Sequence, residues 1–87
     1  MNKTDKYGQK QGKWEVYRPN DNLRVKCTYV NDELHGEFKE YYHNGDLMVE
    51  CNYVNGKLDG EAKTYRYESG EIWHIFTYVN GVIQPKQ

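Results

Sequence analysis

Few side chains of this 87-residue sequence have the types and spacing that catalysis or metal binding requires. The histidines His35, His43 and His74 lack the short spacing of a metal site. Ser69, the single serine, falls in a predicted turn, where no triad can be assembled around it. The glycines also fall in predicted turns and do not form a phosphate-binding loop. We therefore expect no enzymatic activity, no cofactor and no metal.

Four polar side chains interrupt an otherwise apolar face of the predicted sheet. Glu40 and His74 are the acid and the base on this face, and Tyr42 and Arg66 share a neighbouring column. They predict one of two arrangements. Either they line a polar pocket that accepts a small ligand or peptide, or they are half-exposed groups that satisfy one another.

A tandem repeat positions these residues. A shift of 24 residues superposes Gly12, Gly36 and Gly60, and the third copy contains one additional residue before it returns to register. A fixed period of this length indicates a repeat architecture. We expect one domain, residues 1–87, with a polar lead-in, three repeats and a tail: 1–11, 12–35, 36–59, 60–84 and 85–87.

Each repeat contains two alternating segments that predict a β-hairpin. In the central repeat, Asn44-Gly45 favours a two-residue type I′ turn. In the first repeat Asn20-Asp21 takes this place, and in the third a three-residue loop, Glu68-Ser69-Gly70, accommodates the additional residue. The predicted cross-strand pairs are Trp14/Cys27, Glu15/Lys26, Val16/Val25, Phe38/Cys51, Lys39/Glu50, Glu40/Val49, Tyr41/Met48, Tyr42/Leu47, Ala62/Phe76, Thr64/His74 and Tyr65/Trp73.

Turns at Asn31-Asp32 and Asn55-Gly56 should join the repeats. They predict the pairs Tyr29/Leu34, Tyr53/Leu58, Cys27/Gly36 and Cys51/Gly60, with each glycine leaving room for a neighbouring ring. The two cysteines would then lie two strands apart, about 9 to 10 Å, which is too far for a disulfide. The pattern predicts an all-β fold, a single-layer antiparallel meander of about six strands.

Composition excludes several classes of function. With 12 basic and 13 acidic side chains the formal charge is −1, which provides no field for nucleic acid. The polar amino-terminal residues do not form a signal peptide, and no stretch is apolar enough to span a membrane. We expect a cytoplasmic protein without nucleic-acid or membrane partners.

The segments YVNDELHGEFKEYYHNGDL and YVNGKLDGEAKTYRYESGEI resemble the bacterial variant of MORN repeats. The likeness covers residues 12–83 and departs from the repeat pattern at Asp32, at Asn20-Asp21-Asn22 and at the lengthened third hairpin. It implies an elongated, curled, single-layer sheet that serves mainly as a scaffold for protein contacts, with lipid binding proposed for some members. Short bacterial members of the family are often labelled antitoxin components.

Two surfaces could carry the function. The outer face gains apolar side chains toward the third repeat, a composition typical of protein interfaces. The last predicted strand, residues 72–79, is a long apolar edge with only His74 before Pro85, and it could accept a partner strand or a second copy of the chain. The residues predicted to bind a partner are Tyr41, Met48, Tyr65, Trp73, Ile75 and Val79.

These features predict a non-enzymatic protein-binding module, such as an inhibitor, antitoxin or immunity protein. The alternatives are a structural or lipid-associated MORN element, and a small-ligand or peptide binder that uses Glu40, Arg66 and His74.

Overall fold

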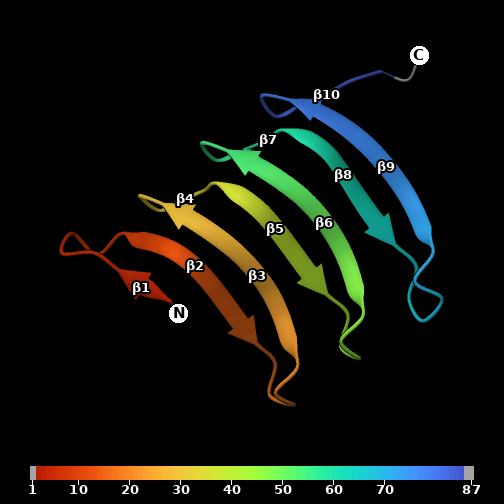
Figure 1. The fold of residues 1–87 in the computed structure, drawn as a ribbon, viewed down its shortest axis with the longest axis horizontal. Coiled ribbons are helices and arrows are strands. Elements are labelled where there is room, and N and C mark those ends of the chain that lie inside the picture. Colours follow the sequence, from red (N-terminus) through yellow and green to blue (C-terminus); the bar gives the residue numbers. More distant parts are fainter. Residues whose placement is uncertain (1, 86–87) are drawn as a thin grey trace.

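Alternating side chains make each repeat a β-hairpin in the computed structural model, which describes residues 2–85. Neighbouring hairpins pair edge to edge in one antiparallel sheet, and the chain crosses that sheet from one side to the other (Figure 1). The Cα atoms extend over 45 × 34 × 11 Å, so the molecule is a single layer. The predicted all-β, single-layer antiparallel meander is confirmed.

The number of strands is larger than predicted, because residues 2–85 form ten strands instead of about six. Six long strands form the three hairpins: β2 (Lys10–Tyr17), β3 (Leu23–Val30), β5 (Gly36–Tyr41), β6 (Leu47–Val54), β8 (Gly60–Tyr65) and β9 (Ile72–Val79). The four additional strands contain two residues each: β1 (Lys3–Thr4), β4 (Glu33–Leu34), β7 (Lys57–Leu58) and β10 (Val82–Ile83). Strands β4, β7 and β10 arise where a turn folds the chain back for two residues, whereas β1 precedes the turn that leads into β2.

Most of the predicted register within the hairpins is confirmed. Trp14 pairs with Cys27, Phe38 with Cys51 and Ala62 with Phe76, so each pair joins an aromatic residue to a small one. The last pair of each hairpin differs, because a β-bulge shifts the register by one residue. The observed end pairs are Tyr17/Leu23, Tyr41/Leu47 and Tyr65/Ile72, in place of the predicted Tyr41/Met48, Tyr42/Leu47 and Tyr65/Trp73.

Longer hairpin loops explain this shift. The Tyr42 N–H donates to the Asp46 carbonyl at 2.7 Å, and the Gly45 N–H donates to the Tyr42 carbonyl at 2.9 Å. Three residues therefore form the loop, and Gly45 has a positive φ of 96° whereas Asn44 does not. The predicted two-residue type I′ turn at Asn44-Gly45 is wrong, because a type I turn followed by a left-handed glycine uses the same residues. The first hairpin has the same three-residue loop, since the Arg18 N–H donates to the Asn22 carbonyl at 2.8 Å, so the predicted two-residue turn at Asn20-Asp21 is also wrong. The third hairpin is again one residue longer, since the Arg66 N–H donates to the Glu71 carbonyl at 2.8 Å, and its loop spans residues 67–70 in place of the predicted Glu68-Ser69-Gly70.

The turns between repeats have the predicted residues, but the glycines that follow them act differently. Asn31-Asp32 and Asn55-Gly56 all have positive φ, as a type I′ turn requires. Tyr29/Leu34 and Tyr53/Leu58 pair as predicted.

Farther along the strands, Lys26 pairs with Lys39 and Glu50 pairs with Lys63. This register is shifted by two residues from the one that would pair each cysteine with a glycine. The predicted pairs Cys27/Gly36 and Cys51/Gly60 are therefore wrong. Gly36 and Gly60 have φ values of 96° and 89°, and an added Cβ would meet no ring at either position. Their role is a left-handed bulge and not space for an aromatic side chain.

Contacts between repeats recur at equivalent positions, and we call each set a junction. At the loop end, the Arg18 guanidinium donates to the Tyr41 carbonyl at 2.9 Å, and the Tyr42 hydroxyl donates to the Tyr65 carbonyl at 2.7 Å. At the other end, the N–H groups of Gly56 and Gly81 donate to carbonyls of the preceding repeat, those of Leu34 and Leu58, at 2.8 and 2.7 Å.

The core is thin, as expected for one layer. Among residues 2–85 only Cys27 and Cys51 are buried, and both are free thiols. Edge-to-face ring pairs, Trp14 with Tyr29 and Phe38 with Tyr53, extend this apolar face in the first two repeats. The part of the chain that the structure describes contains no helix able to cross a membrane.

Candidate interaction surface on the last strand

Strand β9 exposes more apolar surface than its counterparts in the first two repeats. Seven of its eight residues are exposed, whereas β3 and β6 consist largely of half-buried or buried residues. Its large apolar side chains have exposed fractions of 41% to 52%. Together with β10 they form what we call the C-terminal surface: Ile72, Trp73, Ile75, Phe76, Val79, Val82 and Ile83.

Residue type changes at three equivalent positions to create this surface. Where β3 has Arg24, Lys26 and Cys27, and β6 has Met48, Glu50 and Cys51, β9 has Trp73, Ile75 and Phe76. Thus one position that is charged in both earlier repeats becomes Ile75, the position of Arg24 and Met48 becomes Trp73, and a buried cysteine becomes the exposed ring of Phe76. The two long strands of each hairpin pair in the same way in all three repeats, so the surface depends on the side chains of β9.

The edge beside β9 is hollowed. An open hollow of about 770 Å³ is lined by the strand and by the residues that follow β10: Trp73, His74, Ile75, Phe76, Thr77, Ile83, Gln84 and Pro85. Its volume lies in the range of ligand and peptide sites. Residues 86 and 87 of the predicted tail lie outside the described residues.

Trp73 lies at the β-bulge of β9 and turns toward His74. The two rings stack at 5.2 Å with an interplanar angle of 22°, and His74 stacks on Phe76 at 5.6 Å. The Arg66 guanidinium lies over the Trp73 ring at 5.2 Å, a cation–π contact. Trp73 is therefore part of a stacked row with the apolar-face residues of β9, whereas we expected it beside Tyr65 on the outer face.

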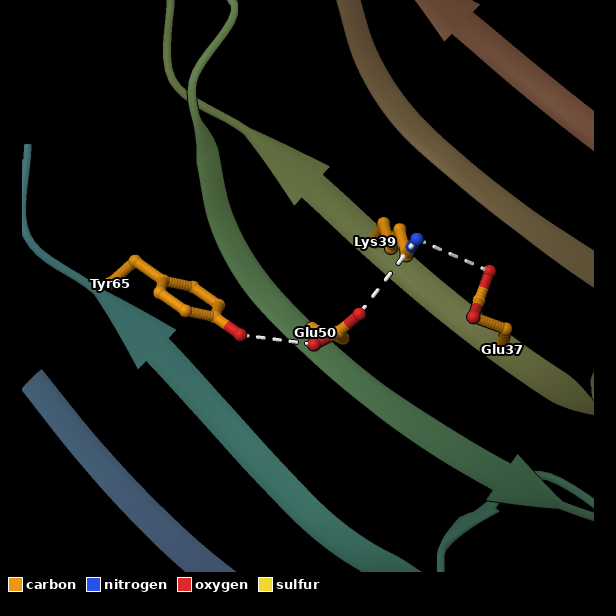
Figure 2. Close-up of polar contacts among 4 residues, drawn as sticks. All are labelled: Glu37, Lys39, Glu50 and Tyr65. Carbon is orange, nitrogen blue, oxygen red and sulfur yellow. Dashed lines mark hydrogen bonds and ion pairs between the residues drawn. The ribbon is translucent and has the colours of Figure 1, made fainter. Parts of the chain in front are cut away.

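Of the outer-face tyrosines predicted to bind a partner, Tyr65 is already engaged in a polar contact. Figure 2 shows the Tyr65 hydroxyl donating to Glu50 Oε1 at 3.0 Å, while Lys39 Nζ lies 3.8 Å from the other oxygen of Glu50 and 3.6 Å from Glu37. Burial, followed by the hydrogen bond to Glu50, raises the pKa of Tyr65. Tyr41, Met48 and Tyr65 are half-buried, so among the six predicted residues Trp73, Ile75 and Val79 are the exposed ones.

The four residues of the predicted polar pocket have separate environments. Tyr42 bonds the Tyr65 carbonyl, Arg66 covers Trp73, and His74 lies between Trp73 and Phe76. Glu40 lies between Val25 and Val49 in the sheet. No hydrogen bond or ion pair links any two of the four, all of which are described. Only His74 lines the hollow.

Burial has its clearest electrostatic effect at Cys51. Loss of solvent, followed by the charges of Glu40 and Glu50, raises the pKa of its thiol to about 11. Burial also raises the pKa of Cys27. Neither cysteine is therefore a ready nucleophile. No group of three or more histidine, cysteine or acidic side chains in residues 2–85 is arranged to hold a metal ion.

Sequence reasoning missed two polar features at the edges of the sheet. The Asn2 carboxamide bonds both backbone groups of Glu15, and the Gln84 N–H donates to the Thr77 carbonyl at 2.8 Å. No pattern in the sequence indicates the Asn2 contact. The Gln84 contact has equivalents at His35 and Asp59, so the repeat period could have revealed it.

Comparison with known families gives one match. A family model described as the MORN repeat variant matches residues 10–31 and 34–55, which together make up just over half of the chain. The third hairpin, which contains the additional residue, lies outside these segments. Searches of curated proteins and of solved structures gave no match. The expected link to antitoxin-labelled proteins gains no support from these comparisons.

Proposed function

The chain belongs to the MORN repeat variant family, and from this premise we propose that it is a non-enzymatic module that binds another protein through its C-terminal surface. The observation that carries the proposal is the exposure of the apolar side chains on β9, which the equivalent strands of the other repeats do not share. Large exposed apolar patches mark interaction sites on soluble proteins.

Trp73 is the side chain that we expect to contribute most to binding. It is 52% exposed, it lies at the end of a stacked row with His74 and Phe76, and Arg66 covers one part of its ring. Tryptophan and arginine are the residue types most enriched among binding hot spots. Because the row is already ordered by stacking, little side-chain entropy should be lost on binding.

We propose further that binding inhibits the partner by covering its surface, as an inhibitor, antitoxin or immunity protein does. A single-layer sheet without a catalytic group can act on a target only by occupying it. Support for this finer role comes from the shape and chemistry of the surface alone.

Affinity capture with a matched pair of variants tests the proposal. Tagged wild-type protein, Trp73→Arg and the control Tyr17→Arg are used to capture proteins from lysate of the source cells. Tyr17 is 55% exposed on the first hairpin, so its replacement makes the same chemical change far from β9. A candidate partner is then purified and titrated against each version.

We expect the wild type and Tyr17→Arg to bind one partner stoichiometrically, and Trp73→Arg to bind at least about tenfold more weakly. Equal affinity for all three versions would contradict the role of the C-terminal surface.

A ligand in the hollow is the second candidate, because a volume of about 770 Å³ suits a small molecule or a short peptide. His74 is the one ionisable side chain that lines the hollow. His74→Ala should therefore weaken binding of such a ligand, and because His74 also stacks on Trp73, it should weaken binding of the protein partner less than Trp73→Arg does. Loss of both activities in this variant would argue against separate sites.

A further inference from the structure

The two edges of the sheet differ in how their backbone groups are satisfied. At the β2 edge, β1 pairs with Lys10 and Gln11, and Asn2 completes the pairing beyond it. The Asn2 carboxamide donates to the Glu15 carbonyl at 2.8 Å and accepts from the Glu15 N–H at 2.7 Å. A single side chain thus supplies both hydrogen bonds that a neighbouring strand would supply.

Repeat equivalence shows what Asn2 replaces. Glu15 is equivalent to Lys39 and Lys63, which pair with Lys26 and Glu50 of the preceding repeat. Asn2 therefore occupies the place of a preceding repeat and closes the β2 edge. Natural sheets commonly protect their edges by such devices.

The β9 edge has no equivalent closure at the same position. Ile75 is the counterpart of Lys26 and Glu50, so its N–H and C=O point away from β8 toward the edge. Within the described residues, β10 pairs only with Val79 and Tyr78, and the Gln84 N–H bonds the Thr77 carbonyl. Within the described residues, the Ile75 N–H and C=O are thus presented unpaired at the edge, whereas the Thr77 carbonyl beyond them is already bonded by Gln84.

We propose that β9 pairs with β9 of a second copy of the chain, antiparallel and around a two-fold axis, to form one continuous sheet. The inference rests on the proposed function, since it identifies a partner for the same strand. Among residues 2–85 only the β9 edge is open, so pairing of two such edges closes the assembly at a dimer.

The side chains of β9 favour their own copy over another repeat. At the junctions, the strand that pairs with the preceding repeat presents a lysine at the central outer position, Lys39 or Lys63. If such a lysine lay opposite Ile75, its ammonium group would be partly desolvated beside an apolar side chain and would have no acidic partner there, which is unfavourable. A second β9 presents Ile75 at this position instead, and the strand contains no lysine, arginine or carboxylate, with His74 as its one basic side chain. Two copies therefore match apolar against apolar, with a formal charge of only −1 each to oppose the approach.

A two-fold axis that continues an antiparallel sheet stands perpendicular to it, so corresponding faces of the two copies lie on the same side. The dimer would place both Trp73 rows on one surface. A partner with two matching sites would then gain from effective concentration.

Measurement of molar mass in solution, with proline as the probe, tests this pairing. Proline at Ile75 removes an N–H that points to the edge, a position at which a strand tolerates proline. Glu15→Pro is the matched control, because it removes the equivalent outward N–H at the β2 edge. Ile75→Lys provides an independent block in case the proline variant does not fold, and circular dichroism checks each fold.

We expect the wild type and Glu15→Pro to have twice the monomer mass of 10.4 kDa, and both Ile75 variants to have the monomer mass. A monomeric wild type at about 0.1 mM, or a dimer that persists in both Ile75 variants, would overturn the inference.

The outcome separates this inference from the proposed function. A monomeric wild type that still captures a Trp73-dependent partner leaves the function standing and removes the dimer. A wild-type dimer that captures no partner retains the dimer and removes the function.

Discussion

The second and third repeats share a backbone plan but face different surroundings. The second repeat lies between two junctions, and its long strands contain a buried cysteine and a salt-bridged outer face (Figure 2). The third repeat has one junction, and its last strand exposes Trp73, Ile75 and Phe76. Both hairpins have the same bulge before the loop, with Tyr41 paired to Leu47 and Tyr65 to Ile72.

The comparison shows that hairpin geometry and surface chemistry are set by different positions. Turn residues, bulge glycines and the period-two pattern define the hairpin, and both repeats have them, although the third loop is one residue longer. Three positions on the last strand, 73, 75 and 76, provide exposed apolar side chains through which we propose that this strand binds a partner. A change at those positions should therefore alter binding more than folding, whereas a change in the second repeat should do the reverse.

The largest expected difference is between two phenylalanines. Phe38 packs edge to face against Tyr53 at 5.7 Å and lies opposite the buried Cys51. Phe76 is 41% exposed and stacks only on His74. Phe38→Ala should lower the free energy of unfolding by about 3 kcal/mol, and Phe76→Ala by about 1 kcal/mol.

Urea denaturation followed by tyrosine and tryptophan fluorescence would measure both values. Equal losses would show that the third repeat is packed like the second, which would remove the basis of the comparison.

A smaller effect is expected at alkaline pH, where the buried thiol of the second repeat ionises. The pKa of Cys51 is raised from 9.0 to about 11, so its folded-state pKa exceeds its unfolded-state pKa. The stability that this thiol contributes is therefore complete below pH 9 and is lost as the pH rises through 11. Two pKa units correspond to about 2 to 3 kcal/mol.

The variant Cys51→Val isolates this effect from the tyrosines that titrate nearby. The difference in unfolding free energy between wild type and variant should be constant below pH 9 and should shift by about 2 kcal/mol against the wild type near pH 11. A constant difference across that interval would contradict a buried, neutral thiol.

The sequence was sufficient to predict the register within the hairpins, because two independent signals, the repeat period and the alternation of side chains, define it. A period of 24 residues aligned the repeats, and alternation within each repeat set the pairs Phe38/Cys51 and Ala62/Phe76. The loop length could not be read in this way. An Asn-Gly pair fits either a two-residue type I′ turn or the end of a three-residue loop. The three-residue loop also suits Asn44, because its side-chain oxygen accepts a hydrogen bond from the Asp46 N–H at 3.0 Å.

The candidate surface was predicted in part. Exposure of Trp73, Ile75 and Val79 follows from their place on the last strand, which the repeat order already defines. The direction of Trp73 depends on a bulge that alternation cannot foresee, since a bulge changes which residues share a face. The closure of the other edge by Asn2 depends on one side chain folding back over 13 residues, which no local pattern indicates.

The smallest expected difference concerns two tyrosine hydroxyls at the loop end of the sheet. Tyr42 and Tyr67 are in edge-to-face contact at 5.1 Å, but the Tyr42 hydroxyl donates to the Tyr65 carbonyl at the junction, whereas the Tyr67 hydroxyl meets His43 Nε2 at an exposed site. Tyr42→Phe leaves a half-buried carbonyl without its donor and should cost about 1 kcal/mol. In Tyr67→Phe, water can take the place of the lost hydroxyl at the exposed His43, so the free energy of unfolding should fall by less than about 0.5 kcal/mol. Both variants keep the ring contact, so urea denaturation would report the hydroxyl alone. A greater loss for Tyr67→Phe would mean that the third hairpin depends on its own loop contacts and not on the junction with the second repeat.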